Sequence, residues 1–108
     1  MTIPNLQREE TPLDQEIVRE VIALTPDSWR AATLEVTYSE EDGVQRYAHV
    51  ISSPEGHKAP IMPSEALFDA THRLGLLFER HGRRWRAVTY RVDLEDDGEL
   101  RYVADFSY

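Results

Sequence analysis

The first apolar pattern in the chain has helical spacing. Apolar residues recur every three or four positions across residues 11–24, at Leu13, Ile17, Val21 and Leu24. This spacing predicts a helix with one buried face. Thr11 can cap this helix, Pro12 suits its first position, and Pro26 ends it because the residue before a proline is pushed out of the α region. Residues 1–10 show no periodicity, so we expect a flexible N-terminal arm.

Alternation with a period of two follows. The segment from Trp29 to about Tyr38 places Ala32, Leu34, Val36 and Tyr38 on one face, which predicts a strand. A second strand is expected over residues 44–52, after the turn at Asp42-Gly43. Both faces of this second strand are partly apolar, so the pattern favours neither orientation strongly.

A second helix is predicted from Pro63-Ser64-Glu65 to about His81, ending at Gly82. Acidic residues lie early in it and basic residues late, as the helix dipole prefers. Its expected buried stripe consists of Leu67, Phe68, Thr71, Leu74, Gly75 and Phe78, with Leu77 beside it.

The segment Trp85–Tyr108 predicts a second hairpin, because alternating apolar residues flank the turn at Asp97-Gly98. The same order of Trp, Arg, Ala, Thr, Val, Asp, Gly and Tyr occurs from Trp29 to Tyr47, which indicates a repeat. We therefore expect an α+β fold in which residues 11–108 form one domain. It would contain two αββ units (helix–hairpin–helix–hairpin) that share a four-stranded, mainly antiparallel sheet with both helices on one face. The strand order stays open.

The composition narrows the classes of function. The chain has 108 residues, no cysteine and a net charge of −8, and its apolar runs are too short to span a membrane. The N-terminus lacks a signal-peptide pattern, so a cytoplasmic protein is expected. The negative charge argues against binding to nucleic acid or to a membrane surface. Strand arginines could line a nucleic-acid surface, but we expect them to pair across strands with Glu35, Asp93 and Asp105.

The residues with catalytic chemistry are sparse. The histidines, which are His49, His57, His72 and His81, have no metal-ligand spacing. Asp69 and His72 are one helical turn apart, and we interpret them as solvated groups on the outer helix face. No glycine-rich phosphate loop or nucleophile elbow is present in the sequence. We therefore expect no catalytic residue, no metal ligand and no cofactor, and we expect that the protein is not an enzyme.

The hairpin turns carry the sharpest charge signal. Each turn has three consecutive carboxylates, which is more than a turn requires, and these are the candidate partner-binding residues: Glu40, Glu41, Asp42, Glu95, Asp96 and Asp97. A partner with a basic surface would be steered onto them. Whether the two turns lie together depends on the unknown strand order. Trp29 and Trp85 are interpreted as covers at the ends of the core, with exposed interface anchors as the alternative.

The chain also resembles a known family. The residues that carry the resemblance are Pro26 with Trp29, Ser64 with Leu67 and Phe68, Trp85, Thr89, Asp97-Gly98 and the closing Asp105-Phe106-Ser107-Tyr108. In this order they are similar to the YezG-like immunity proteins, over about residues 13–108. The resemblance implies an antitoxin of a bacterial polymorphic toxin system that binds and neutralises a cognate toxin, typically a nuclease domain. The alternative is a non-catalytic ligand-binding or regulatory domain that forms a homodimer through its sheet face.

Overall fold

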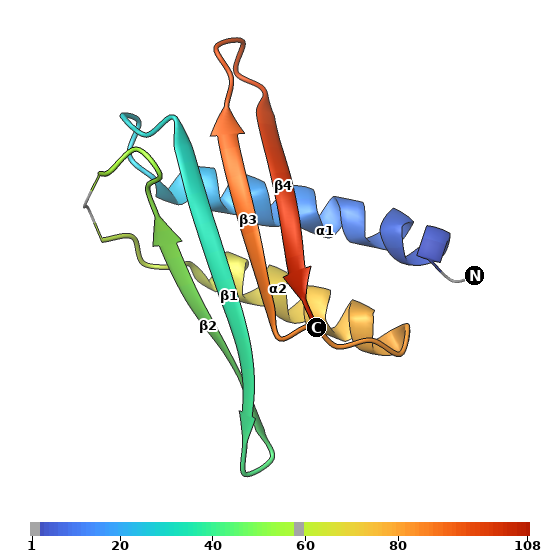
Figure 1. Cartoon of the computed structure of the whole chain (residues 1–108). Helices are drawn as coiled ribbons and strands as arrows, with labels where there is room; N and C mark the ends of the chain where they lie inside the picture. The colour runs from blue at the N-terminus through green and yellow to red at the C-terminus, as the bar shows by residue number, and fades with distance from the viewer. Residues whose placement is uncertain (1–2, 58–59) are drawn as a thin grey trace.

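The computed structural model describes residues 3–57 and 60–108. Within them the protein is α+β, with two helices and a four-stranded antiparallel open sheet (Figure 1). The elements, in chain order, are α1 (Ile3–Leu24), β1 (Ala31–Glu41), β2 (Val44–Ser52), α2 (Glu65–Arg80), β3 (Ala87–Leu94) and β4 (Leu100–Ser107). The strands expected on either side of each Asp-Gly turn are confirmed.

The strand order, which the sequence left open, is β2-β1-β3-β4. The two hairpins join through their first strands, since β1 pairs with β3 in antiparallel orientation. Leu34 in β1 lies opposite Ile51 of β2 on one side and opposite Tyr90 of β3 on the other. The first strand of each hairpin is thereby central, and β2 and β4 form the two edges.

Alternate residues along the central strands are buried. Leu34 and Val36 of β1 are fully buried, whereas Glu35 and Thr37, which alternate with them, are exposed. This is the alternation that the sequence predicted for the strand. In β2, Ile51 is buried and Val50 is exposed, which fixes the orientation that the sequence left weakly defined. Both helices contribute to the same hydrophobic core as the buried strand residues, and they pass behind the strands in Figure 1.

Helix α1 begins earlier than the sequence predicts. Residues 3–10 were expected to form a flexible arm, but in the structure they are helical and Pro12 lies inside the helix. Residues 1 and 2 of the predicted arm lie outside the described residues. Pro12 donates no backbone hydrogen bond and crowds the preceding turn, which costs a helix roughly 3 kcal/mol. Tertiary contacts offset this cost, because Leu6 is 5% exposed and belongs to the core.

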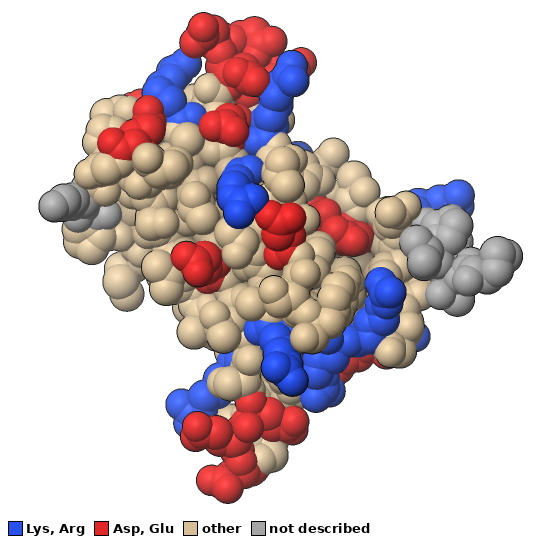
Figure 2. Space-filling model, in the orientation of Figure 1, with Lys and Arg blue, Asp and Glu red and all other residues tan. Residues whose placement is uncertain are grey.

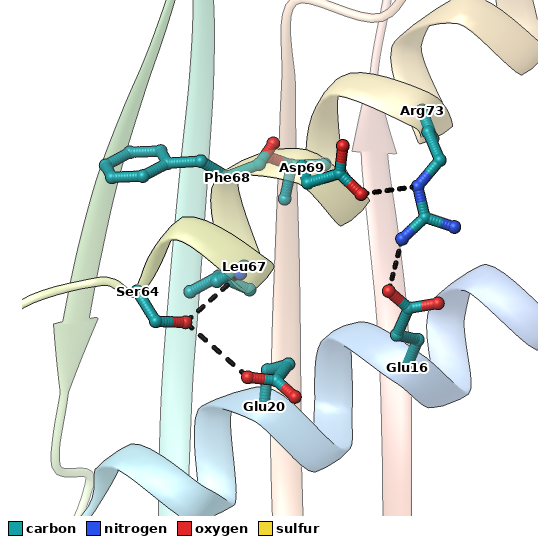
Figure 3. Close-up of polar contacts among 8 residues, drawn as sticks. Glu16, Glu20, Ser64, Leu67, Phe68, Asp69 and Arg73 are labelled. Atoms are coloured by element: carbon teal, nitrogen blue, oxygen red, sulfur yellow. Dashed lines mark hydrogen bonds and ion pairs between the residues drawn. The ribbon is translucent and has the colours of Figure 1, made fainter.

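Helix α2 begins where its sequence predicts. The hydroxyl of Ser64 accepts a hydrogen bond from the Leu67 backbone N–H at 3.1 Å, which satisfies a free donor of the first turn. The same hydroxyl donates to Glu20 of α1 at 3.5 Å (Figure 3). Further along the helices, the Arg73 guanidinium binds both Asp69, at 2.8 Å, and Glu16 of α1. These polar contacts hold the two helices side by side.

One member of the predicted α2 stripe is misplaced. Phe68 is 44% exposed, and its ring meets His49 of edge strand β2 at a centroid distance of 4.6 Å. Ala70 is buried in the helix instead. Gly75, by contrast, belongs to the stripe as predicted, because a Cβ at this position would collide with the Tyr47 hydroxyl. The spacing of apolar residues identified the buried face of the helix but not which residues at the edge of that face are exposed.

Candidate partner-binding surface

The two acidic turns lie at opposite ends of the sheet. Because β1 and β3 are antiparallel neighbours, the hairpins that they begin point in opposite directions. Figure 1 shows the β1–β2 turn and the β3–β4 turn at the two ends of the strands. Carboxylates colour both ends red in Figure 2, and the longest dimension of the molecule is 40 Å. The structure does not bring the six predicted residues together, so each turn is a separate candidate surface.

Three chain segments meet at the β3–β4 end. Arg30, just before β1, joins them: its backbone N–H donates to Glu55 at 2.9 Å and its guanidinium binds Asp96 at 3.0 Å. Asp27 lies in the same loop as Arg30. We call this surface the acidic end, and its carboxylates are those of Asp27, Glu55, Glu95, Asp96, Asp97 and Glu99.

Within the described residues, the acidic end carries more carboxylates than cations. Arg30 binds Asp96, Arg101 binds Glu95 at 2.8 Å, and the His57 ring lies 3.9 Å from Glu55. The Asp96 side chain is fully exposed even in its ion pair. The turn itself is well defined, because Asp97 accepts a hydrogen bond from the Glu99 backbone N–H at 3.0 Å and Gly98 supplies a φ of 87°. A basic partner would therefore meet exposed carboxylates in a turn with a defined conformation.

The β1–β2 end has a different charge balance. Its turn residues Glu40, Glu41 and Asp42 lie beside the basic segment that precedes β3, where Arg84 approaches Glu40 at 3.6 Å. Arg84 also binds Glu79 at 2.5 Å and lies over the ring of Tyr38. We call this surface the mixed end, and it contains Glu40, Glu41 and Asp42 together with Arg46, Arg83 and Arg84. Of the three turn carboxylates, Glu40 lies within ion-pair distance of an arginine, and that arginine also binds Glu79.

The outer face of the sheet carries polar residues and isolated apolar ones. Arg91 of β3 binds Asp105 of β4 at 2.6 Å, as predicted for arginines on an open face. Val50 and Val103 are more than half exposed on the two edge strands. Tyr90 of β3 is fully buried, so its side chain lies on the opposite, core-facing side of the sheet.

Both tryptophans are buried. Trp29 is 3% exposed and Trp85 is 2% exposed, so the interpretation as covers of the core is confirmed. The alternative, in which they are exposed anchors for a partner, is wrong because their rings are already enclosed. Trp29 stacks on His57 with ring planes 13° apart. That histidine belongs to the loop that also supplies Glu55 to the acidic end.

The side chains of Asp69 and His49 each contact a neighbouring residue. Asp69 binds Arg73 at 2.8 Å. His49 is within hydrogen-bonding distance of the Thr71 hydroxyl, at 2.9 Å, and its burial lowers the pKa of its imidazole. Across residues 3–57 and 60–108, no three His, Cys, Asp or Glu side chains are grouped so that they could hold a metal ion.

Sequence reasoning missed a buried acidic pair in α1. Asp14 is 4% exposed and accepts a hydrogen bond from the Tyr90 hydroxyl at 2.5 Å. Glu10, which is half-buried, lies one helical turn earlier in α1. Burial and the neighbouring Asp14 raise the pKa of Glu10 to about 8, and burial also raises the pKa of Asp14. The missed signal was the spacing of Leu6, Glu10, Asp14 and Ile17, which continues the apolar stripe of α1 towards the N-terminus.

Comparisons with known proteins assign no family. No protein-family model matches the chain, and no curated protein matches it. Among the described residues, no helix is long and apolar enough to cross a membrane.

Proposed function

We propose that this protein is a non-catalytic immunity protein that binds a cognate toxin stoichiometrically and neutralises it. The proposed toxin is a nuclease with a basic substrate cleft, and both proteins would meet in the cytoplasm. The observation that carries the proposal is the surplus of exposed carboxylates at the acidic end. The resemblance to YezG-like immunity proteins points to the same function.

The physical basis of this inhibition is charge mimicry. A nuclease binds the phosphates of its substrate with lysine and arginine side chains. Carboxylates fixed by the Arg30 contacts could occupy the same subsites, and a charged surface of this kind also accelerates association. Because the turns lie at opposite ends, we assign the main toxin contact to the acidic end. Glu40, Glu41 and Asp42 of the mixed end then provide a matched comparison.

We also propose that the chain is a duplication of one αββ unit, with both helices on the same face of the shared sheet. The supporting observations are the central pairing of the first strands of the two hairpins and the burial of equivalent tryptophans before each of them. The shared core of both helices and the alternating burial in β1 and β3 support the common face.

The function is tested by co-expressing the full chain with the protein encoded next to it. Immunity predicts that growth is rescued and that the two proteins co-purify in a fixed ratio. The triple variant Glu95→Gln, Asp96→Asn, Asp97→Asn should weaken both effects, whereas Glu40→Gln, Glu41→Gln, Asp42→Asn should leave them nearly unchanged. A chain that forms a homodimer and ignores the neighbouring protein would contradict immunity. It would favour the alternative of self-association through the outer sheet face, where Val50 and Val103 are exposed.

A further inference from the structure

Each hairpin turn contains an aspartate followed by a glycine, Asp42-Gly43 at the mixed end and Asp97-Gly98 at the acidic end. This pair of residues can react with itself, because the glycine has no side chain to obstruct attack of its backbone nitrogen on the Cγ of the aspartate. Both pairs are exposed to solvent. A difference in their reactivity must therefore come from the two turns that hold them.

The reaction is an isomerisation in two steps. In the first step the glycine nitrogen bonds to the Cγ of the protonated aspartate, and the proton of that nitrogen leaves with the carboxyl hydroxyl as water. The product is a five-membered cyclic imide. In the second step water adds to one of the two imide carbonyls, and the ring opens either to aspartate or to isoaspartate, in which the main chain runs through Cβ. One water is lost and one is gained, so mass and negative charge are unchanged and no cofactor is needed.

The turn at the acidic end holds both reacting groups in hydrogen bonds. The Gly98 backbone N–H donates to the Glu95 carbonyl at 2.9 Å, and the Asp97 carboxylate accepts from the Glu99 backbone N–H at 3.0 Å. Attack of the Gly98 nitrogen on the Asp97 carboxyl group requires both bonds to break. Arg30, from another part of the chain, also binds the carboxylate that precedes Asp97, at 3.0 Å. This turn therefore opposes the reaction.

The turn at the mixed end holds its Asp-Gly pair differently. Glu41 and Val44 are the last paired residues of β1 and β2, so Asp42 and Gly43 alone form the turn. Asp42 has a φ of 53°, in the left-handed region that disfavours residues with a side chain, although aspartate tolerates it better than most. Within the described residues, neither of the hydrogen bonds that hold the other Asp-Gly pair has a counterpart here.

The same turn lies at the tip of a two-stranded ribbon. The pairing of β1 with β3 extends to Thr37, and Tyr38 makes one further backbone hydrogen bond to Arg86. Beyond Tyr38, in the part of the chain that the structure describes, β1 pairs with β2 alone, and Figure 1 shows this hairpin extending past the other strands. The ion pair between Glu40 and Arg84 near the tip is exposed and screened by water. Two-stranded hairpins are marginally stable and segments with few contacts open most often, so this turn opens more readily.

We propose that Asp42 is a modification site at which the folded protein converts aspartate spontaneously to isoaspartate, and that the turn around Asp97 suppresses the same reaction. Conversion adds one carbon to the main chain at Asp42, which releases this residue from the left-handed conformation that the two-residue turn requires. The exposed product is a substrate for a methyltransferase that recognises the isoaspartate carboxyl group. The carboxylates of the acidic end are unchanged, so the modification is independent of the function proposed for that end.

Ageing of the full-length folded protein at neutral pH tests this proposal. Tandem mass spectrometry with electron-transfer fragmentation distinguishes isoaspartate from aspartate at each position, although their masses are equal. The same protein unfolded in urea is the reference, because both Asp-Gly pairs are then free of their turns and should react at similar rates. In the folded protein the rate at Asp42 should exceed the rate at Asp97 by roughly tenfold or more, since opening the protected turn breaks two hydrogen bonds.

A matched pair of variants provides a second readout. Asp42→Glu keeps the negative charge but does not form the five-membered ring. It should therefore remove most of the isoaspartate that a purified isoaspartyl methyltransferase detects with labelled S-adenosylmethionine in the aged protein. Asp97→Glu should leave this signal nearly unchanged. The proposal would be overturned by equal rates at the two positions in the folded protein, by strong protection of Asp42 relative to the unfolded reference, or by a signal that Asp97→Glu removes and Asp42→Glu retains.

Discussion

At one end of the sheet Glu55 from another loop joins Glu95, Asp96 and Asp97, and at the other end Arg84 approaches Glu40, the first of the three turn carboxylates. The two turns look alike in the sequence. Their surroundings differ because the loops that meet each turn come from distant parts of the chain. Arg30 and Asp96, which form an ion pair, are 66 residues apart. A run of carboxylates in a sequence therefore does not define a partner-binding surface until the residues that lie beside it in the fold are known.

The largest expected effect tests whether the two ends share one core. Trp29→Ala and Trp85→Ala each remove a large buried ring, and each should lower the free energy of unfolding by about 3–5 kcal/mol. Urea denaturation followed by circular dichroism measures both variants. If only one of the two substitutions lowers the free energy of unfolding strongly, the core does not extend to the end of the sheet where the other tryptophan lies. The two ends would then differ in packing as well as in charge.

The turns themselves give the next effect. Gly43 and Gly98 have φ values of 79° and 87°, so alanine at either position should cost about 1–2 kcal/mol. The two variants are expected to be similar in stability, measured by thermal unfolding. Their toxin binding should differ, because only Gly98→Ala distorts the acidic end. Equal losses of binding would contradict the assignment of the contact to that end.

A single arginine at each end gives the smallest effect on stability. Arg30→Ala and Arg84→Ala remove exposed ion pairs, which water and salt screen, so each should change the free energy of unfolding only slightly. Arg30→Ala adds negative charge to the acidic end and should speed association with a basic partner, although it also frees Asp96. Arg84→Ala should change association little. Stopped-flow mixing at low salt measures the association rate of both variants. A larger change with Arg84→Ala than with Arg30→Ala would contradict the assignment of the partner contact to the acidic end.

Local signals in the sequence predicted most of the elements. Ser64 identified the start of α2, and the alternation around Leu34 and Val88 identified the central strands. The helical state of residues 3–10 was not predictable from the same rules. Proline is favoured at the first position of a helix, so Pro12 predicted that α1 begins there. Burial of Leu6 in the core outweighs this preference, and the helix begins earlier.

The candidate surfaces depended on non-local pairing. The position of the two turns follows from the contact between β1 and β3, strands that begin 56 residues apart in the sequence. No periodicity within either hairpin reports on that contact. The roles of Arg30 and Glu55 were hidden for the same reason, since each is an ordinary loop residue until the fold brings it to Asp96. The sequence therefore identified the charged residues but not which of them act together.

We propose that the acidic end, rather than the mixed end, meets the partner. The association rate constant of the toxin with two triple variants, measured at low and at physiological salt, tests this proposal. Glu95→Gln, Asp96→Asn, Asp97→Asn should slow association by roughly tenfold or more at low salt, and salt should reduce that difference. Glu40→Gln, Glu41→Gln, Asp42→Asn should change the rate by less than about threefold. Equal rates for the wild type and the first variant, or a larger loss with the second, would contradict the account.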